Sequence, residues 1–156
     1  MKTLILYATK HGATAEIAQR IAGRIDGAET HDLKQGGVPS LDGFDCVIIG
    51  SSLYAGMVRK EAKAFAAQNA AVLCEKKLGL FLSGFSEKEE KKSFEANFPA
   101  DVLNAAKAAS LLGGIFDPKK AGFFERLVMR AVTKQSEYIC NIDDGKIAKF
   151  AETMQA

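Results

Sequence analysis

The chain has 156 residues, of which 47% are hydrophobic and 26% are charged, and its formal net charge at pH 7 is +2. This length and balance are ordinary for a soluble globular protein, and we expect one domain spanning residues 1–156. The charge is too small to argue for nucleic-acid binding, and no apolar run reaches the length that spans a membrane.

Cysteine usage points to a reducing environment. Cys46, Cys74 and Cys140 form no C-x-x-C pair and cannot all pair with one another. Cys46 lies within an apolar run, which favours a core thiol. The N-terminus begins as a strand and shows no signal sequence. Together these features predict a cytoplasmic protein.

The first half of the chain alternates apolar strands with amphipathic helices. An unbroken apolar run opens at Leu4 and is followed, after a polar turn, by apolar residues at helical spacing. This pattern predicts a buried strand at residues 4–7 and a helix over residues 13–26. The same reasoning gives, in order, a strand at 29–33, a strand at 44–50, a small-residue loop at 51–56, a helix at 59–73 and a strand at 78–83.

The second half continues the alternation with more charge. Residues 87–106 have the pattern of a charged helix that Pro99 interrupts. A last strand at 108–116, a helix over 123–134 and a final helix capped by Asp143 follow. Apolar strands that alternate with amphipathic helices predict an α/β fold, with a five-stranded parallel sheet covered by helices on both faces.

The polar turn between the first strand and the first helix is suited to holding an anion. The first backbone N–H groups of a helix have no partner inside it, and the helix dipole places partial positive charge there. Gly12 lets the backbone approach a phosphate closely, and Thr9 and Thr14 can add hydroxyl groups. The alternative is that both threonines only brace an ordinary turn. The candidate phosphate-binding residues are Thr9, Lys10, His11, Gly12, Ala13 and Thr14.

The opening strand, turn and helix match a family signature position by position. The matching residues are Ile5, Leu6, Tyr7, Thr9, Gly12, Thr14 and Ala18. Through them the chain resembles the flavodoxin family, which implies a doubly wound five-stranded sheet of strand order 2-1-3-4-5. The resemblance also implies an FMN cofactor whose phosphate is held by this turn. His11 departs from the family pattern, because many flavodoxins have a hydroxyl residue there.

The resemblance places two further loops beside the flavin ring. In the order 2-1-3-4-5 the loops after strands one, three and four meet at one edge. A flavin ring needs apolar walls, an aromatic stacking face and backbone groups at its polar edge. Tyr54 and Phe85 are the aromatic residues available, and core packing is the alternative for Phe85. The candidate ring-binding residues are Ser51, Ser52, Leu53, Tyr54, Ala55, Gly56, Ser83, Gly84 and Phe85.

The C-terminal third narrows the resemblance to one branch. The stretches LGGIF at 112–116 and FFERLVMR at 123–130 are similar to the menaquinone-dependent protoporphyrinogen oxidase branch. Arg126, Arg130 and Lys134 fall at helical spacing, so the helix from Phe123 to Lys134 can rest on an anionic membrane surface, where a quinone is reached. Docking of an acidic redox partner and an ordinary amphipathic helix covering the sheet are the alternatives.

The sequence therefore predicts an FMN-binding, flavodoxin-like redox protein that passes electrons through FMN to a partner protein or a quinone. Two alternatives stay open: a quinone-dependent protoporphyrinogen IX dehydrogenase-like enzyme, and a flavin-free module that keeps the fold. The charge bears on this choice, because flavodoxins that serve as general carriers are typically acidic and this chain is not. We expect no catalytic triad and no metal site, since His11 and His31 lack a ligand cluster.

Overall fold

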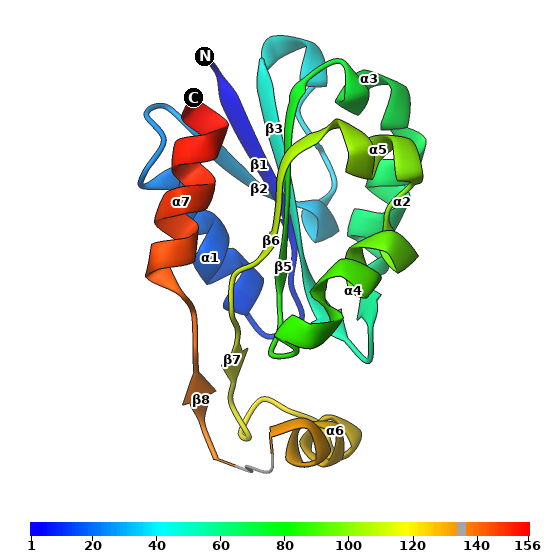
Figure 1. Ribbon diagram of the computed structural model, residues 1–156, viewed down its shortest axis with the longest axis vertical. Helices are drawn as coiled ribbons and strands as arrows, with labels where there is room; N and C mark the ends of the chain where they lie inside the picture. The colour runs from blue at the N-terminus through cyan, green and yellow to red at the C-terminus, as the bar shows by residue number, and fades with distance from the viewer. Residues whose placement is uncertain (134–136) are drawn as a thin grey trace.

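The computed structural model describes residues 1–133 and 137–156 and places a parallel sheet between two layers of helices (Figure 1). The five main strands are hydrogen-bonded in the order β2-β1-β3-β5-β6. Counted along the chain, this is the expected order 2-1-3-4-5, and the predicted fold class is confirmed. The strands are β1 (Thr3–Ala8), β2 (Glu29–Asp32), β3 (Cys46–Tyr54), β5 (Lys77–Ser83) and β6 (Ala106–Leu111).

The central strands are buried on both faces, as their unbroken apolar runs predict. In β1, Leu4 and Leu6 pack into the core on one face, while Ile5 packs into the core on the other, because successive side chains of a strand point to opposite faces. Neighbouring strands lie in parallel register, with Leu6 opposite Ile49. Cys46 is buried in the second core, as predicted, and this burial raises the pKa of its thiol.

Helices cover both faces of the sheet. α1 (Ala13–Ala22) and α7 (Asp144–Gln155) lie on one face (Figure 1). The predicted N-cap of α7 is confirmed, since the Asp143 carboxylate accepts a hydrogen bond from the N–H of Lys146. The other face carries α2 (Lys60–Gln68), α3 (Ala70–Cys74), α4 (Glu90–Asn97) and α5 (Ala100–Ala105). The 3₁₀ helices are η1 (Leu33–Gln35), η2 (Leu41–Gly43) and η3 (Glu87–Glu89). Within residues 1–133 and 137–156, no helix combines the length and apolar character that a membrane crossing requires.

Two helices differ from expectation. α1 ends at Ala22 rather than near Asp26, because Gly23 follows as the C-cap and the next N–H groups bond three residues back instead of four. The expected helix over residues 59–73 is two helices, because the backbone of Asn69 leaves the helical conformation. The side-chain amide of Asn69 donates to a carbonyl of the preceding turn, which stabilises the break.

A short hairpin replaces the loop that was predicted at residues 51–56. β3 continues to Tyr54, and the chain turns back into the antiparallel strand β4 (Met57–Val58). The turn residues Ala55 and Gly56 have φ values of 49° and 78°. A tight two-residue hairpin of this kind requires both residues to be left-handed. The loop prediction was therefore wrong, and the small residues instead supply the turn.

The last strand of the sheet also ends sooner than predicted. β6 stops at Leu111 instead of continuing over residues 108–116, because Gly113 has a φ of 93° and turns the chain out of the sheet. The chain then forms β7 (Ile115–Phe116), α6 (Phe123–Thr133) and β8 (Ile139–Cys140), and β7 pairs with β8. α6 lies beyond the carboxyl ends of the strands, at the end of these two arms (Figure 1). Lys134, the last residue of the predicted helix, falls outside the described residues.

Candidate functional site

A cavity of about 680 Å³ lies where β1, β3 and β5 end. This volume is within the range of small-molecule and cofactor sites, about 300–1,000 Å³. Open α/β sheets bind ligands at the carboxyl edge, at the point where the strand order reverses. Most residues selected from the sequence line the cavity: Thr9, Lys10, His11, Ala13, Ser52, Leu53, Tyr54, Ala55, Gly56, Ser83, Gly84 and Phe85.

Gly12 shapes the turn at the start of α1. Its φ is 101°, and no atom lies within 4 Å of the position that a Cβ would take. The hydroxyl of Thr9 accepts a hydrogen bond from the Gly12 N–H at 2.9 Å, which braces the turn from within. The N-cap residue, Gly12, makes no side-chain cap, so among the described residues the N–H groups of the first turn of α1 are available to an external acceptor. Ala13, the first residue of the helix, lines the cavity at this point.

Thr14 and Ser51 lie beside the cavity without lining it. The Thr14 side chain is fully buried, and its hydroxyl shares a hydrogen bond with the Ser83 hydroxyl at 2.7 Å. The Ser51 hydroxyl donates to the Ser52 carbonyl and accepts from the N–H of Arg59. Both hydroxyls therefore join neighbouring segments at the sheet edge. A direct role in ligand binding for Thr14, Ser51 or Gly12 stays a prediction.

Glu125 of α6 reaches the turn from across the cavity. Its carboxylate lies 2.5 Å from Lys10 Nζ and 2.7 Å from His11 Nε2. Burial acts to raise the pKa of Glu125, but the hydrogen bonds and charges of Lys10 and His11 outweigh it and hold that pKa below its ordinary value. Sequence reasoning missed Glu125, because it stands 114 positions from His11 and no spacing rule connects them.

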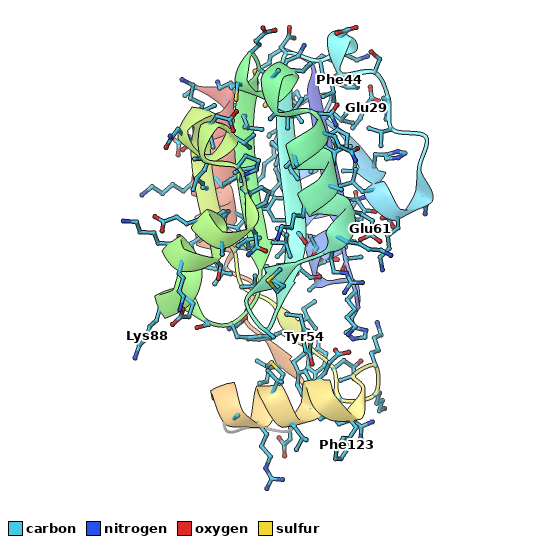
Figure 2. The ribbon with its side chains drawn as sticks, turned by 90° about the vertical axis from the view of Figure 1, so that its right-hand side faces the viewer. Glu29, Phe44, Tyr54, Glu61, Lys88 and Phe123 are labelled. Carbon is cyan, nitrogen blue, oxygen red and sulfur yellow. The ribbon has the colours of Figure 1, made fainter. Side chains whose placement is uncertain are left out.

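Asn97 holds the hairpin that carries Tyr54. Tyr54 lies at the end of the sheet that faces α6 (Figure 2). The buried side chain of Asn97 donates to the Gly56 carbonyl at 2.8 Å and accepts from the Val58 N–H at 3.2 Å. The sequence offered no signal for this role, since Asn97 is one polar residue near the end of a charged helix. The clamp fixes the loop whose residues line the cavity.

Replacing Asn97 by alanine is expected to lower the free energy of unfolding by about 2 kcal/mol, because the buried Val58 N–H loses its acceptor and the Ser93 and Gly56 carbonyls lose their donor. Urea unfolding followed by circular dichroism measures the change. Asn104→Ala is the matched control: Asn104 is exposed on α5, and its replacement should change stability by less than roughly 0.5 kcal/mol. Equal effects of the two replacements would contradict the clamp.

The remaining wall of the cavity, away from the turn at Gly12, combines a polar group with apolar side chains. The buried hydroxyl of Ser52 has no hydrogen-bond partner among the described residues, which is unusual for a buried polar atom. Phe85 lines the cavity and is half-buried, so it does not serve the core alone. Val128 and Met129 of α6 close the far side. The position of α6 over this cavity could not be predicted from the sequence.

Comparison with known proteins decides the family. Residues 4–140 match the model of the flavodoxin domain. The chain belongs to the flavodoxin domain family. Over 150 residues it is 25% identical to protoporphyrinogen IX dehydrogenase [quinone] of Escherichia coli strain K12, an alignment that covers 87% of this chain and 81% of that protein.

Solved structures agree on the fold. Flavodoxin from Fusobacterium nucleatum, bound to flavin mononucleotide, matches with a TM-score of 0.55 at 14% identity, covering 99% of this chain and 96% of that one. Rubredoxin oxygen:oxidoreductase from Desulfovibrio gigas matches with a TM-score of 0.63 at 12% identity. That match covers 98% of this chain but 35% of the other, so this chain spans about a third of that protein. The resemblance inferred from the turn at Thr9–Thr14 is thus confirmed at the level of family and fold.

Proposed function

We propose that this flavodoxin-family protein binds FMN in the cavity at the sheet edge and transfers electrons through it. The observation that carries the proposal is the uncapped start of α1, which opens into a cavity of cofactor size beside the Gly12 turn. Charge-assisted hydrogen bonds from backbone N–H groups contribute roughly 1.5–3 kcal/mol each, so the turn can bind a phosphate without a dedicated lysine.

The rest of the cavity fits the other end of FMN. Tyr54 and Phe85 supply aromatic faces against which a flavin ring can pack, worth about 0.5–1.5 kcal/mol beyond the area that they bury. The Ser52 hydroxyl can satisfy its unused hydrogen-bonding capacity at the polar edge of the ring. When bound, FMN supplies the electron-transfer chemistry, while the residues named here bind and orient it and limit its contact with water.

Purification and spectroscopy test this proposal directly. We expect the protein to carry, or to take up stoichiometrically, a yellow chromophore that is released by denaturation and identified as FMN. Riboflavin, which lacks the phosphate, should bind much more weakly because the α1 amides lose their ligand. A protein that remains colourless after incubation with excess FMN would leave the flavin-free module as the correct description.

A second candidate is a quinone-dependent protoporphyrinogen dehydrogenase. The 25% identity to the Escherichia coli enzyme of that name, over 87% of this chain, favours it. Electrons would then pass from the reduced porphyrin precursor through FMN to a quinone, rather than to a partner protein. Anaerobic turnover of protoporphyrinogen with menadione separates the two candidates, since only the enzyme consumes both together.

The outward face of α6 supports contact with an anionic membrane surface, where a quinone is held. Phe123 lies on the side of the helix turned away from the sheet (Figure 2). Phe123 and Leu127 are 69% and 48% exposed, and Arg126 and Arg130 are exposed beside them. Apolar and basic side chains on one face are typical of helices that lie on anionic lipid. The protein should sediment with vesicles containing anionic phospholipid and not with neutral ones; sedimentation with neither removes this contact and leaves docking to an acidic redox partner.

A further inference from the structure

Glu125 connects α6 to the phosphate turn. Its side chain is only 15% exposed, and its two carboxylate oxygens pair separately with Lys10 and His11. α6 itself stands beyond the edge of the sheet, at the end of the arms formed by β7 and β8 (Figure 1). The ion pair with Lys10 and the hydrogen bond with His11 therefore link α6, which stands on an extended segment, to the main body of the protein.

Lys10 extends the link to the ring side of the cavity. Its ammonium group lies 4.8 Å from the centroid of the Tyr54 ring, within the range of a cation–π interaction. The two contacts connect α6, through Glu125 and Lys10, to the phosphate turn, and from there to Tyr54 in the β3–β4 hairpin. All three residues line the cavity. Val128 and Met129, one turn after Glu125 on α6, line the same cavity. A ligand in the cavity would lie against residues of all three elements.

We propose that Glu125 is a positioning residue, which fixes α6 as a cover over the cavity by pairing with Lys10 and His11 and so slows the escape of the bound ligand. The ligand named here, FMN, rests on the proposed function. The cover itself does not, because both contacts of Glu125 are made with the protein's own residues. Escape of a ligand past Val128 and Met129 requires α6 to move, and that movement breaks both pairs.

The partial burial of the cluster gives the pairs their strength. Fully exposed ion pairs contribute little, because water and salt screen them. Here the Glu125 and His11 side chains are 15% and 32% exposed, and the lowered pKa of Glu125 agrees with a carboxylate that is stabilised in its charged form. Removing the carboxylate also leaves Lys10 and His11 without their shared partner in a partly dehydrated site, which adds to the cost.

The release rate of FMN, measured by stopped-flow fluorescence against an excess of apo-flavodoxin acceptor, tests the cover. Glu125→Gln should release FMN about tenfold faster than the wild type, while Glu137→Gln, which removes an exposed acid from the same segment, should not change the rate. Unchanged or slower release in Glu125→Gln overturns the proposal. Slower release would mean that the carboxylate competes with the phosphate for Lys10 and His11.

Lys10→Met provides a second test. If Lys10 and Glu125 affected the release rate independently, the effects of their replacements would be additive. We expect the Lys10→Met, Glu125→Gln double variant to release FMN more slowly than the sum of the two single effects predicts, because both replacements remove the same Lys10–Glu125 pair, while Lys10→Met alone leaves the contact of Glu125 with His11. Fully additive effects of the two replacements overturn the proposal.

Hydrogen exchange in the absence of flavin separates the cover from the cofactor assignment. The amides of residues 126–133 should exchange faster in Glu125→Gln than in the wild type, while those of β3 and β5 are unchanged. If the wild-type protein takes up no FMN, the proposed function fails but this measurement still decides the cover. Equal exchange of α6 in both proteins overturns it.

Discussion

Replacing Ala13 by aspartate is expected to lower the affinity for FMN at least about a hundredfold while leaving the fold intact. Ala13 is the first residue of α1 and lines the cavity. A carboxylate there would compete with the phosphate for the α1 amides and repel its negative charge. The same carboxylate is favourable for the helix itself, because negative charge in the first turn complements the dipole by about 0.3–1 kcal/mol.

The opposite signs of these two effects make the variant informative. Fluorescence titration gives the dissociation constant, and urea unfolding shows whether stability is kept. Ala13→Ser is the control, because it adds a polar atom without the charge and should bind FMN within a few-fold of the wild type. An Ala13→Asp protein that is stably folded and binds FMN normally would place the phosphate elsewhere.

The Gly113→Ala protein should be less stable than the wild type by about 3 kcal/mol or more. Gly113 has a φ of 93°, which a residue with a Cβ rarely adopts. An added Cβ would also lie 2.2 Å from the carbonyl oxygen of Asn141, a backbone atom that cannot rotate away. The strain and the clash fall at the same position, and urea unfolding measures their sum.

Gly43→Ala is the control for this replacement. Gly43 has no atom within 4 Å of its missing Cβ and does not have a left-handed φ, so its replacement should change stability by less than roughly 0.5 kcal/mol. If Gly113→Ala were as stable as Gly43→Ala, Gly113 could not lie as close to the backbone of Asn141 as the structure shows.

The layered sheet was predictable because its determinants are local. Each central strand is an apolar run that must be buried on both faces, and each covering helix carries its apolar residues at helical spacing. The predictions for residues 51–56 and 108–116 were wrong because the backbone conformation of one residue determines the direction of the chain there. Ala55 turns β3 into a hairpin, and Gly113 takes the chain out of the sheet, and nothing in the flanking residues announces either left-handed φ.

The residues of the candidate site likewise divide into those that could be predicted from the sequence and those that could not. The turn that we propose binds phosphate could be selected from the sequence because the whole feature lies between a strand and the helix that follows it, in the six residues from Thr9 to Thr14. Asn97 and Glu125 could not, because each acts on a loop far away in the chain, 41 positions away for the Asn97 contact with Gly56 and 114 for the Glu125 contact with His11. Contacts of that separation depend on how the helices pack on the sheet, which periodicity alone does not specify.

Gly114 and Asn141 lie where the chain leaves the sheet and where it returns, and their contacts determine which part of the chain can vary. The N–H of Asn141 bonds to the Gly114 carbonyl at 2.9 Å, and the Gly114 N–H bonds to the Asn141 side chain at 2.8 Å, so the departing and returning strands of the detour touch at its base. No described residue between these two belongs to either of the two core clusters that flank the sheet, so this segment can be lengthened, shortened or exchanged without altering those clusters. Changes in this segment would alter what surrounds the mouth of the pocket and, under the proposed function, the choice of redox partner, while the turn at Thr9–Thr14 stays the same.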